Sequence, residues 1–205
     1  MTTSERDEAA AGEGTETERA VVLDYLPHGR PGDDRPQYKK SPLAYAVGER
    51  TLRLVELTVS ADAGVSIGDR VVVSPEADRE AVERVRDVDY DDLSQGARNE
   101  LEYVVEELVE DDEQRFVDFY NDAQPITLRL HQLNLLPGIG KKLRNNILDE
   151  RKRGRFESFE DLTDRVSGLH SPEEKLVERI IEELRDEDLK YKTFVGREGK
   201  FVAGE

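Results

Sequence analysis

No cysteine or tryptophan occurs in the 205 residues of the chain, and there is a single methionine. Without cysteine the protein can form neither a disulfide framework nor a thiolate metal site. The three histidines, His28, His131 and His170, are too scattered along the sequence to predict a metal cluster. We therefore expect no metal and no other cofactor.

Long apolar runs are also missing. No stretch approaches the roughly 20 apolar residues that a membrane-spanning helix needs. The N-terminus is acidic and lacks the basic start and apolar core of a signal peptide. We expect a cytoplasmic protein that makes no contact with a membrane and acts as a monomer.

Positive charge is scarce. The chain carries 47 acidic and 30 basic residues, a formal net charge of -17. Such a balance usually argues against a polyanionic partner, because binding to phosphates relies on Lys and Arg. The acids are spread along most of the chain, however, which resembles the solvent adaptation of proteins from extreme halophiles, with a dedicated basic partner or an acidic interaction tail as alternatives. If the acidity serves the solvent, function is to be sought where the sequence departs from it.

The N-terminal half has the pattern of a small β domain. Residues 1–19 are acidic with almost nothing apolar, so we expect a disordered tail. Short runs rich in β-branched residues, separated by Gly and Pro turn signals, then predict an OB-like β-barrel over residues 20–90. The expected strands are 20–26, 43–47, 51–59 and 70–74. Residues 77–88 fit either a strand or a solvated helix.

Helical periodicity begins near Leu93. Ser94 is a candidate cap for one helix, a second ends near Asn121, and the two connect the halves over residues 91–123. Residues 124–187 then predict an all-helical module, whose first helix starts at Pro125. Capping-box patterns at Ser158 and Ser171 predict two later helices. Residues 188–205 predict a C-terminal β-hairpin and tail, so the expected fold class is α+β.

Two glycines bracket one apolar residue in the segment Leu136-Pro137-Gly138-Ile139-Gly140-Lys141-Lys142. Glycine accepts positive φ and lets a ligand approach the backbone. The next helix starts at about Gly140, and the first N–H groups of a helix lack partners and attract anions. A nucleic-acid phosphate is the obvious anion, although a tight turn between two helices is the simpler alternative.

The segment from Leu128 to Arg155 is basic in an acidic chain. It contains eight basic residues and two acids, Asp149 and Glu150. Capping of a helix C-terminus accounts for the basic residues just before Gly154. It does not account for Lys141 and Lys142, which lie at the opposite helix end. The basic residues that we expect to contact phosphate are Lys141, Lys142, Arg144, Arg151, Lys152, Arg153 and Arg155.

Leu-Pro-Gly-Ile-Gly followed by Lys-Lys is similar to the helix-hairpin-helix motif of many DNA- and RNA-binding proteins. The resemblance implies that Gly138, Ile139 and Gly140 supply backbone donors to phosphate, and that Lys141 and Lys142 supply charge. Residues 168–172 resemble a second, degenerate hairpin, which predicts a tandem, SAM-like arrangement with the second copy as scaffold.

A wider resemblance covers about residues 21–202. The runs Asp24-Tyr25-Leu26-Pro27-His28-Gly29-Arg30-Pro31 and Arg35-Pro36-Gln37-Tyr38-Lys39-Lys40, together with the later hairpin, look like the archaeal family called domain of unknown function 655. That resemblance implies an OB-like barrel joined to the hairpin module and a nucleic-acid-binding role, and it supplies no established activity.

Aromatic and basic residues also alternate in the N-terminal half, an arrangement that suits single-stranded RNA or DNA. The candidate contacts are Tyr25, Arg30, Arg35, Tyr38, Lys39 and Lys40. Half-buried packing is the alternative interpretation for the tyrosines.

The sequence thus predicts a non-catalytic protein that grips the nucleic-acid backbone without reading its sequence, RNA being favoured over DNA. Two alternatives remain. A nuclease or glycosylase of DNA repair also uses this hairpin, and a ribosome- or polymerase-associated protein would dock its acidic helix, 94–110, on a basic partner.

Overall fold

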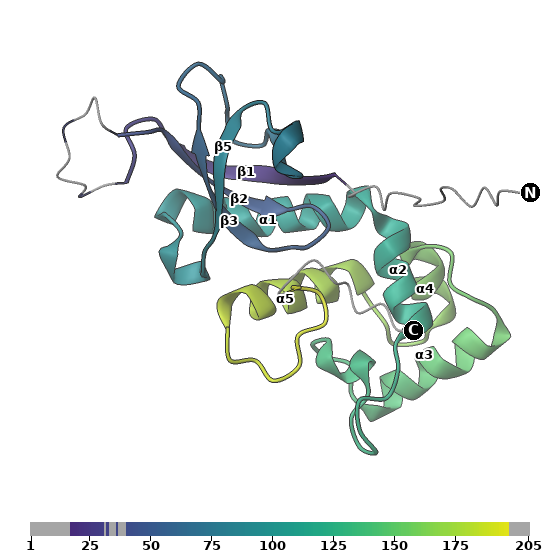
Figure 1. Cartoon of the computed structure of the whole chain (residues 1–205). Helices are drawn as coiled ribbons and strands as arrows, with labels where there is room; N and C mark the ends of the chain where they lie inside the picture. Colours follow the sequence, from purple (N-terminus) through teal and green to yellow (C-terminus); the bar gives the residue numbers. More distant parts are fainter. Residues whose placement is uncertain (1–16, 31, 33–35, 37–39, 197–205) are drawn as a thin grey trace, which may run out of the picture.

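The computed structural model describes residues 17–30, 32, 36 and 40–196, which form an α+β fold with a sheet at one end and a group of helices at the other (Figure 1). The predicted fold class is confirmed at this level. The strands are β1 (Glu18–Leu26), β2 (Leu43–Gly48), β3 (Leu54–Val59), β4 (Arg70–Ser74) and β5 (Val82–Asp87). The α-helices are α1 (Gln95–Asp111), α2 (Glu113–Asp122), α3 (Lys141–Arg153), α4 (Phe159–Arg165) and α5 (Pro172–Arg185). Short 3-10 turns are η2 (Glu76–Asp78), η3 (Tyr90–Asp92) and η4 (Gln132–Leu135).

The sheet is antiparallel, with the strand order β4-β1-β2-β3-β5. The ambiguous segment 77–88 supplies its edge strand β5. Within the described residues no ladder joins β4 to β5, so the sheet is a curled half-barrel whose two edges remain separate. Glu18 and Arg19, which we expected in the disordered tail, are the first residues of β1. Residues 1–16 lie outside the described residues.

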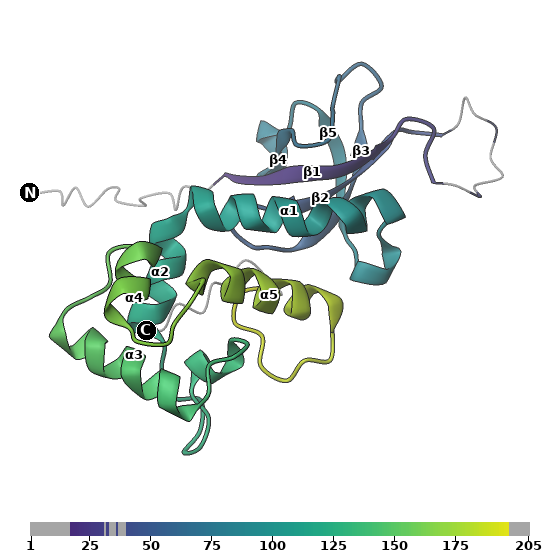
Figure 2. The ribbon, with the colours of Figure 1, turned by 180° about the vertical axis from the view of Figure 1, so that it is seen from behind.

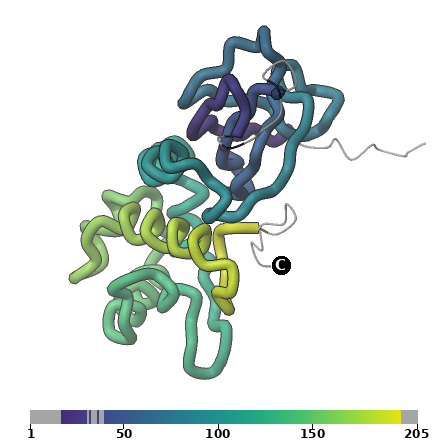
Figure 3. Tube along the Cα trace, turned by 90° about the vertical axis from the view of Figure 1, so that its left-hand side faces the viewer, coloured from purple at the N-terminus to yellow at the C-terminus, as the bar shows by residue number. Residues whose placement is uncertain are grey.

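Both faces of the sheet are buried, because strand residues alternate between them. Val21 and Leu23 of β1 belong to a cluster that continues through α1 into the other helices. Ala20 and Val22 point the other way and pack inside the curl of the sheet. Figures 2 and 3 show the resulting layers, with α1 lying across the sheet and α5 on the far side of α1.

The first long helix begins where the sequence predicted. Ser94 caps α1, its side chain accepting a hydrogen bond from the amide of Ala97 at 3.0 Å. Ser158 caps α4 in the same way through the amide of Asp161. The other predicted cap is wrong, since Ser171 adopts a left-handed conformation and its side chain accepts no capping bond. Helix α5 still starts at Pro172, whose fixed φ suits the first helical position.

The C-terminal prediction differs from the structure where it can be compared. Residues 190–196 contain no strand, and residues 197–205 lie outside the described residues. Instead, Glu183 of α5, which is fully buried, accepts hydrogen bonds from the amides of Thr193, Phe194 and Val195 at 2.8 to 3.1 Å. A carboxylate thus satisfies the amides that a neighbouring strand would otherwise have to pair.

Candidate nucleic-acid interface

The approach to the hairpin carries no acidic residue at all. From Ala123 to Leu148 the sequence contains no Asp or Glu, although acids make up 47 of the 205 residues. The helix that we predicted from Pro125 is absent there. Residues 126–130 instead form a loop, closed by a bridge between Pro125 and His131, and only η4 is helical. The Thr127 hydroxyl accepts the amides of Arg129 and Leu130, an alternative to helix that Thr side chains offer.

The hairpin itself is a tight turn built on Gly138. This glycine has a φ of 75°, a conformation that other residues adopt only with strain. The amide of Ile139 donates to the carbonyl of Leu136 at 3.2 Å, which closes the turn. The Ile139 side chain is buried in the cluster that contains Leu136 and Ile147. An apolar plug therefore anchors the turn while its backbone stays at the surface.

Of the three amides that the motif resemblance implied as donors, that of Gly138 has no partner among the described residues, and the other two are bonded within the turn. Ile139 already donates to Leu136, and the Gly140 amide makes a 3.3 Å bond to the carbonyl of Gly138. Among the described residues, the first turn of α3 is different, because the amides of Lys141, Lys142 and Leu143 have no partner there. This is the usual state of helix N-termini, where the dipole also favours an anion. The candidate anion site therefore extends from the amide of Gly138 to the first turn of α3.

The two glycines of the hairpin, at positions 138 and 140, have different roles. Gly138 is required by its backbone conformation. Gly140 has an ordinary φ of -78°, and a side chain added to it would meet nothing within 4 Å. Nothing within the described fold demands glycine at position 140. A side chain there would occupy the space in front of the first turn of α3, where a ligand of the free amides would lie.

Asn134 and Arg144 brace the turn from behind. The Asn134 amide donates to the carbonyl of Ile139 at 2.9 Å, and its oxygen accepts a bond from the Arg144 guanidinium at 3.1 Å. Arg144 also bonds the side chain of Asn145. Both partners of Arg144 are neutral, so its positive charge is not compensated. No sequence signal marks Asn134, because an Asn in a short turn has many roles.

The other predicted basic residues are occupied within the fold. Arg151 donates to the carbonyls of Tyr120, Asn121 and Ala123 at 2.8 to 3.3 Å, and so caps the C-terminus of α2. Burial lowers the pKa of its guanidinium. Lys152 is 2.9 Å from Asp149, and Arg153 is 2.7 Å from Glu150.

Arg155 has two acidic partners. It bonds Asp118 at 2.9 Å and Asp122 at 2.7 Å, and these hydrogen bonds raise its pKa and lower that of Asp122. The alternative role for residues 151–153 was to cap the C-terminus of their own helix. Arg151 does cap a helix C-terminus, but the helix is α2. Lys141 and Lys142 are exposed, and neither has an ion-pair partner in the described part of the chain.

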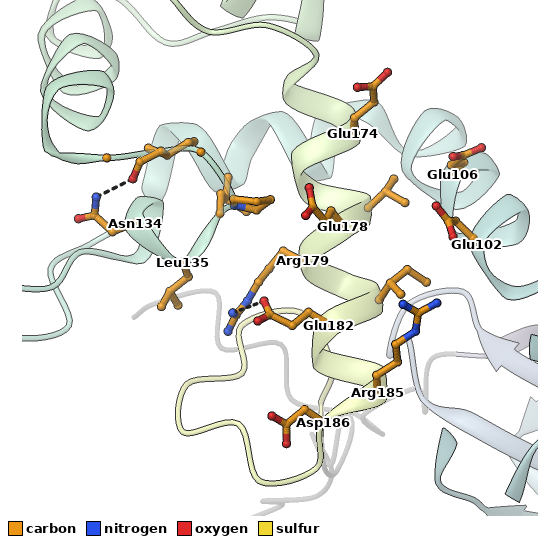
Figure 4. Close-up of a pocket in the computed structure, with 17 residues that line it drawn as sticks. Glu102, Glu106, Asn134, Leu135, Glu174, Glu178, Arg179, Glu182, Arg185 and Asp186 are labelled. Atoms are coloured by element: carbon orange, nitrogen blue, oxygen red, sulfur yellow. Dashed lines mark hydrogen bonds and ion pairs between the residues drawn. The ribbon is translucent and has the colours of Figure 1, made fainter. Parts of the chain in front are cut away.

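The hairpin also forms one wall of a groove of about 1110 Å³ (Figure 4). Gly138, Ile139 and Gly140 lie on one side. The opposite walls come from α1 and α5 and carry the acids Glu102, Glu106, Glu174, Glu178, Glu182 and Asp186. A polyanion entering the groove would meet these carboxylates. We therefore place the candidate phosphate contacts at the first turn of α3 and not inside the groove.

The predicted N-terminal contacts lie elsewhere. Tyr25 is half-buried and packs on the inner cluster of the sheet, while Lys40 is partly buried. Arg30 pairs with Glu56 through a hydrogen bond of 2.8 Å that raises its pKa. Arg35, Tyr38 and Lys39 fall outside the described residues. Figures 1 and 2 show that this end of the sheet and α3 lie at opposite ends of the molecule, so the structure does not bring the two sets of predicted contacts together.

A second turn repeats the geometry of the first. Leu136 and Val166 are buried, Gly138 and Gly168 have φ of 75° and 88°, and Ile139 and Leu169 are buried. In each turn the last of these residues donates its amide to the first, since Leu169 bonds Val166 at 3.1 Å. Both turns are followed directly by a helix, α3 or α5.

The two turns also contact each other's helices. A side chain added at Gly138 would meet Nζ of Lys175, in the first turn of α5, at 3.3 Å. One added at Gly168 would meet Leu143, in the first turn of α3, at 4.0 Å. The Asn146 side chain bonds the carbonyl of Ser167 at 3.1 Å. The two turns and their helices therefore form one paired unit. Glu173 and Glu174 make the start of its second helix, α5, acidic.

These features define a class of α+β protein in which a half-barrel sheet is joined through α1 to a helical unit with two glycine turns. The chain belongs to the family DUF655, described as a protein of unknown function, whose model matches residues 16–196. It is 39% identical over 178 residues, 86% of this chain and 78% of the relative, to the uncharacterized protein MJ0038 of Methanocaldococcus jannaschii. The crystal structure of Af1531 from Archaeoglobus fulgidus, of the same family, is similar with a TM-score of 0.80 and 43% identity, over 87% of this chain and 99% of that one.

Two features of the described residues bear on alternative classes. None of their helices combines the length and apolar character needed to cross a bilayer. They also contain no group of three or more His, Cys, Asp or Glu side chains placed to hold a metal ion.

Proposed function

We propose that this protein is a non-catalytic nucleic-acid-binding protein that grips the phosphate backbone at the amino end of α3. The observation that carries the proposal is the arrangement at Gly140. The amides of Lys141, Lys142 and Leu143 have no partner among the described residues, a side chain added at the preceding Gly140 would meet nothing within 4 Å, and the two lysines are exposed without acidic partners there. Backbone amides at a helix start bind phosphate through hydrogen bonds that ignore base identity.

The paired glycine turns support a tandem helix-hairpin-helix unit. The first copy carries Gly140 and the lysines, whereas the second has His170 and Ser171 at the equivalent places and acids just after them. Acids at the start of α5 would repel phosphate. We therefore assign binding to the first hairpin and a supporting role to the second.

The sheet supports the proposal of an OB-like domain, since an OB-fold is a five-stranded, partly open barrel and this sheet has five curled antiparallel strands. OB-like barrels bind oligonucleotides, and Tyr25, Arg30 and Lys40 lie at the end of this sheet. Together with the archaeal relatives, this favours RNA over DNA. We propose that the general acidity is an adaptation to concentrated salt, which leaves the acid-free run 123–148 as the functional exception.

Substitution of Gly140 tests the proposal most cleanly. Because a side chain at Gly140 meets open space, Gly140→Ala should fold normally and bind single-stranded and duplex RNA or DNA at least tenfold more weakly, that is by about 1.4 kcal/mol. Gly140→Val should lose more. The loss should persist at about 1 M salt, where screening leaves only short-range hydrogen bonds. Lys141→Ala should matter mainly at low salt.

Gly154→Ala is the matched control. Gly154 lies at the other end of α3, has an extended backbone, and also has open space around an added side chain. Binding should be unchanged in this variant. Equal binding by folded Gly140→Val and the parent protein would refute the proposed function.

A second candidate function follows from the acidic groove. Its apolar floor and carboxylate walls fit a basic segment of a protein, as in the ribosome- or polymerase-associated alternative. Recovery of one protein partner in a pull-down that survives nuclease treatment would favour this candidate. Turnover of labelled duplex, abasic or structured RNA substrates with Mg²⁺ or Mn²⁺ would instead favour a repair-type enzyme.

A further inference from the structure

Leu128 is the most exposed large apolar side chain of the described residues, with a relative exposure of 107%. It lies at the tip of the loop 126–130, which protrudes at the end of the molecule farthest from the sheet, the end at which α3 also lies (Figures 1 and 3). A leucine held wholly in solvent loses the favourable burial of its side chain. Its position therefore suits a surface that is covered when a partner binds.

The loop that carries Leu128 is well fixed. The amides of Ile126 and Thr127 both donate to the carbonyl of Leu130, at 2.8 and 3.0 Å. The Gln132 side chain accepts the amide of Gln124 at 2.6 Å, and the Gln132 amide donates to the Gln124 carbonyl at 2.9 Å. A loop held at its base presents the leucine in a defined place, which lowers the entropy lost on binding.

Charge indicates which partner the loop meets. Leu128 is followed by Arg129, which is exposed, and lies within the acid-free run 123–148 that also contains Lys141 and Lys142. No carboxylate in this run would repel a polyanion. A basic protein partner would find its complement in the acidic groove instead, so the charge pattern selects nucleic acid for the loop.

We propose that Leu128 packs against the face of an unstacked nucleobase while Arg129 pairs with the adjoining phosphate. This inference rests on the proposed function and adds to it, because it names the ligand as a strand with accessible bases: a single strand, a bulge or a frayed end. Apolar side chains make such contacts by wedging between bases. The start of α3 holds the phosphate backbone of the nucleic acid. The loop, in turn, can bind only where neighbouring bases are unstacked.

The test uses a reporter that the chain lacks. As there is no tryptophan in the sequence, Leu128→Trp places a single tryptophan at the loop tip, and its emission can be excited selectively over that of the seven tyrosines. Tyr103→Trp is the matched control, since Tyr103 is 68% exposed on α1. Each full-length variant is titrated with three fluorescein-labelled RNA probes, namely a 20-nucleotide single strand, a hairpin with a one-nucleotide bulge and a blunt duplex, and binding is followed by anisotropy (about 20 nucleotides covers one or two binding sites).

Tryptophan emission of the Leu128→Trp variant should be quenched on saturation with the single strand and the bulged hairpin, and emission of the Tyr103→Trp variant should not change. Leu128→Ala, a change in a fully exposed side chain, should weaken binding of these two probes by about tenfold and of the blunt duplex by much less. Unchanged emission of Leu128→Trp while anisotropy reports binding would overturn the inference and leave the proposed function standing. Failure of the parent protein to bind any probe would overturn both.

Discussion

At the scale of single residues, the function proposed for the hairpin depends on which backbone groups the fold uses and which it leaves open. Gly138 and Gly140 look equivalent in the sequence. The structure separates them, because of the two only Gly138 has a positive φ and only Gly140 faces open space. The donors were expected at residues 138–140 because the bonds of Ile139 and Gly140 within the turn leave no trace in the sequence.

His131, at the base of the loop 126–130, is a buried residue whose titration can be measured. Its Nδ1 accepts the amide of Leu133 at 3.1 Å, so the fold uses the neutral ring. Burial, followed by the nearby Arg151 and Arg144, lowers the pKa of His131 below the ordinary 6.5. In the window between the two values, the unfolded chain binds more protons than the folded one, so the free energy of unfolding rises with pH.

We expect the contribution of His131 to be complete above about pH 6.5 and to be lost as the pH falls below it. His131→Asn keeps an acceptor but cannot titrate, so its unfolding free energy should depend less on pH between about pH 5 and 7. Urea unfolding at several pH values measures this slope. The exposed His170→Asn serves as the control, and an unaltered slope in His131→Asn would contradict the assignment.

At the scale of elements, amphipathic patterns and caps were sufficient for most of the fold. Strands β1 to β4 and α1 with its Ser94 cap follow from local sequence, because each is decided by apolar spacing or by one capping residue. The segment of β5 fitted strand or helix equally well, and α5 starts where expected although Ser171 does not cap it. The segment from Pro125 was predicted as the first helix of the hairpin module because it is rich in leucine and leads into the hairpin. The hydroxyl of Thr127 and the bridge at Pro125 override that pattern.

The segment after α5 could not be predicted for a different reason. Its β-branched and aromatic residues have the composition of a strand, but their amides are bound by a side chain ten or more residues earlier. Glu183 also bonds the Arg179 guanidinium, 3.0 Å away and only 5% exposed. The hydrogen bonds between Glu183 and the later amides depend on how the segment packs against α5. No local sequence pattern indicates them.

We expect Glu183→Ala to lower the free energy of unfolding by about 3 to 5 kcal/mol, because it removes the buried one of the two acidic partners of Arg179 and the acceptor of three backbone amides. Hydrogen exchange of the Thr193, Phe194 and Val195 amides should accelerate as well. Glu182→Gln is the control. Glu182 pairs with the same Arg179 at 2.7 Å but is exposed, so its loss should cost at most about 1 kcal/mol. Equal effects of the two substitutions would show that Glu183 does not hold the segment.

At the scale of the whole molecule, charge is divided between two neighbouring surfaces. The acid-free run 123–148 supplies Lys141, Lys142 and Arg144, while the groove on the other side of the hairpin is lined with carboxylates. The basic island is visible in the sequence, but Arg151, Lys152, Arg153 and Arg155 were counted toward it. Only the folded structure shows that these four residues have acidic or carbonyl partners. We therefore limit the candidate phosphate-binding surface to the start of α3.

The negative charges of the groove should weaken the binding of nucleic acid through electrostatic repulsion. Glu174→Gln combined with Glu178→Gln removes two of its negative charges, and we expect affinity for single-stranded RNA to rise about two- to fivefold at about 0.2 M salt and not at about 2 M. The pair Glu76→Gln and Glu80→Gln, on exposed residues of the sheet half, makes the same change in net charge and should have little effect. A comparable gain from the control pair would attribute the change to net charge alone.

Phosphate capture is assigned to three specific amides, and amide chemical shifts report on them directly. In a ¹H–¹⁵N titration of the labelled protein with a short single-stranded RNA, the largest shifts should fall on Lys141, Lys142 and Leu143, with smaller ones along the loop 126–130. Shifts concentrated on α1 and α5 along the acidic groove, with α3 unchanged, would contradict the assignment.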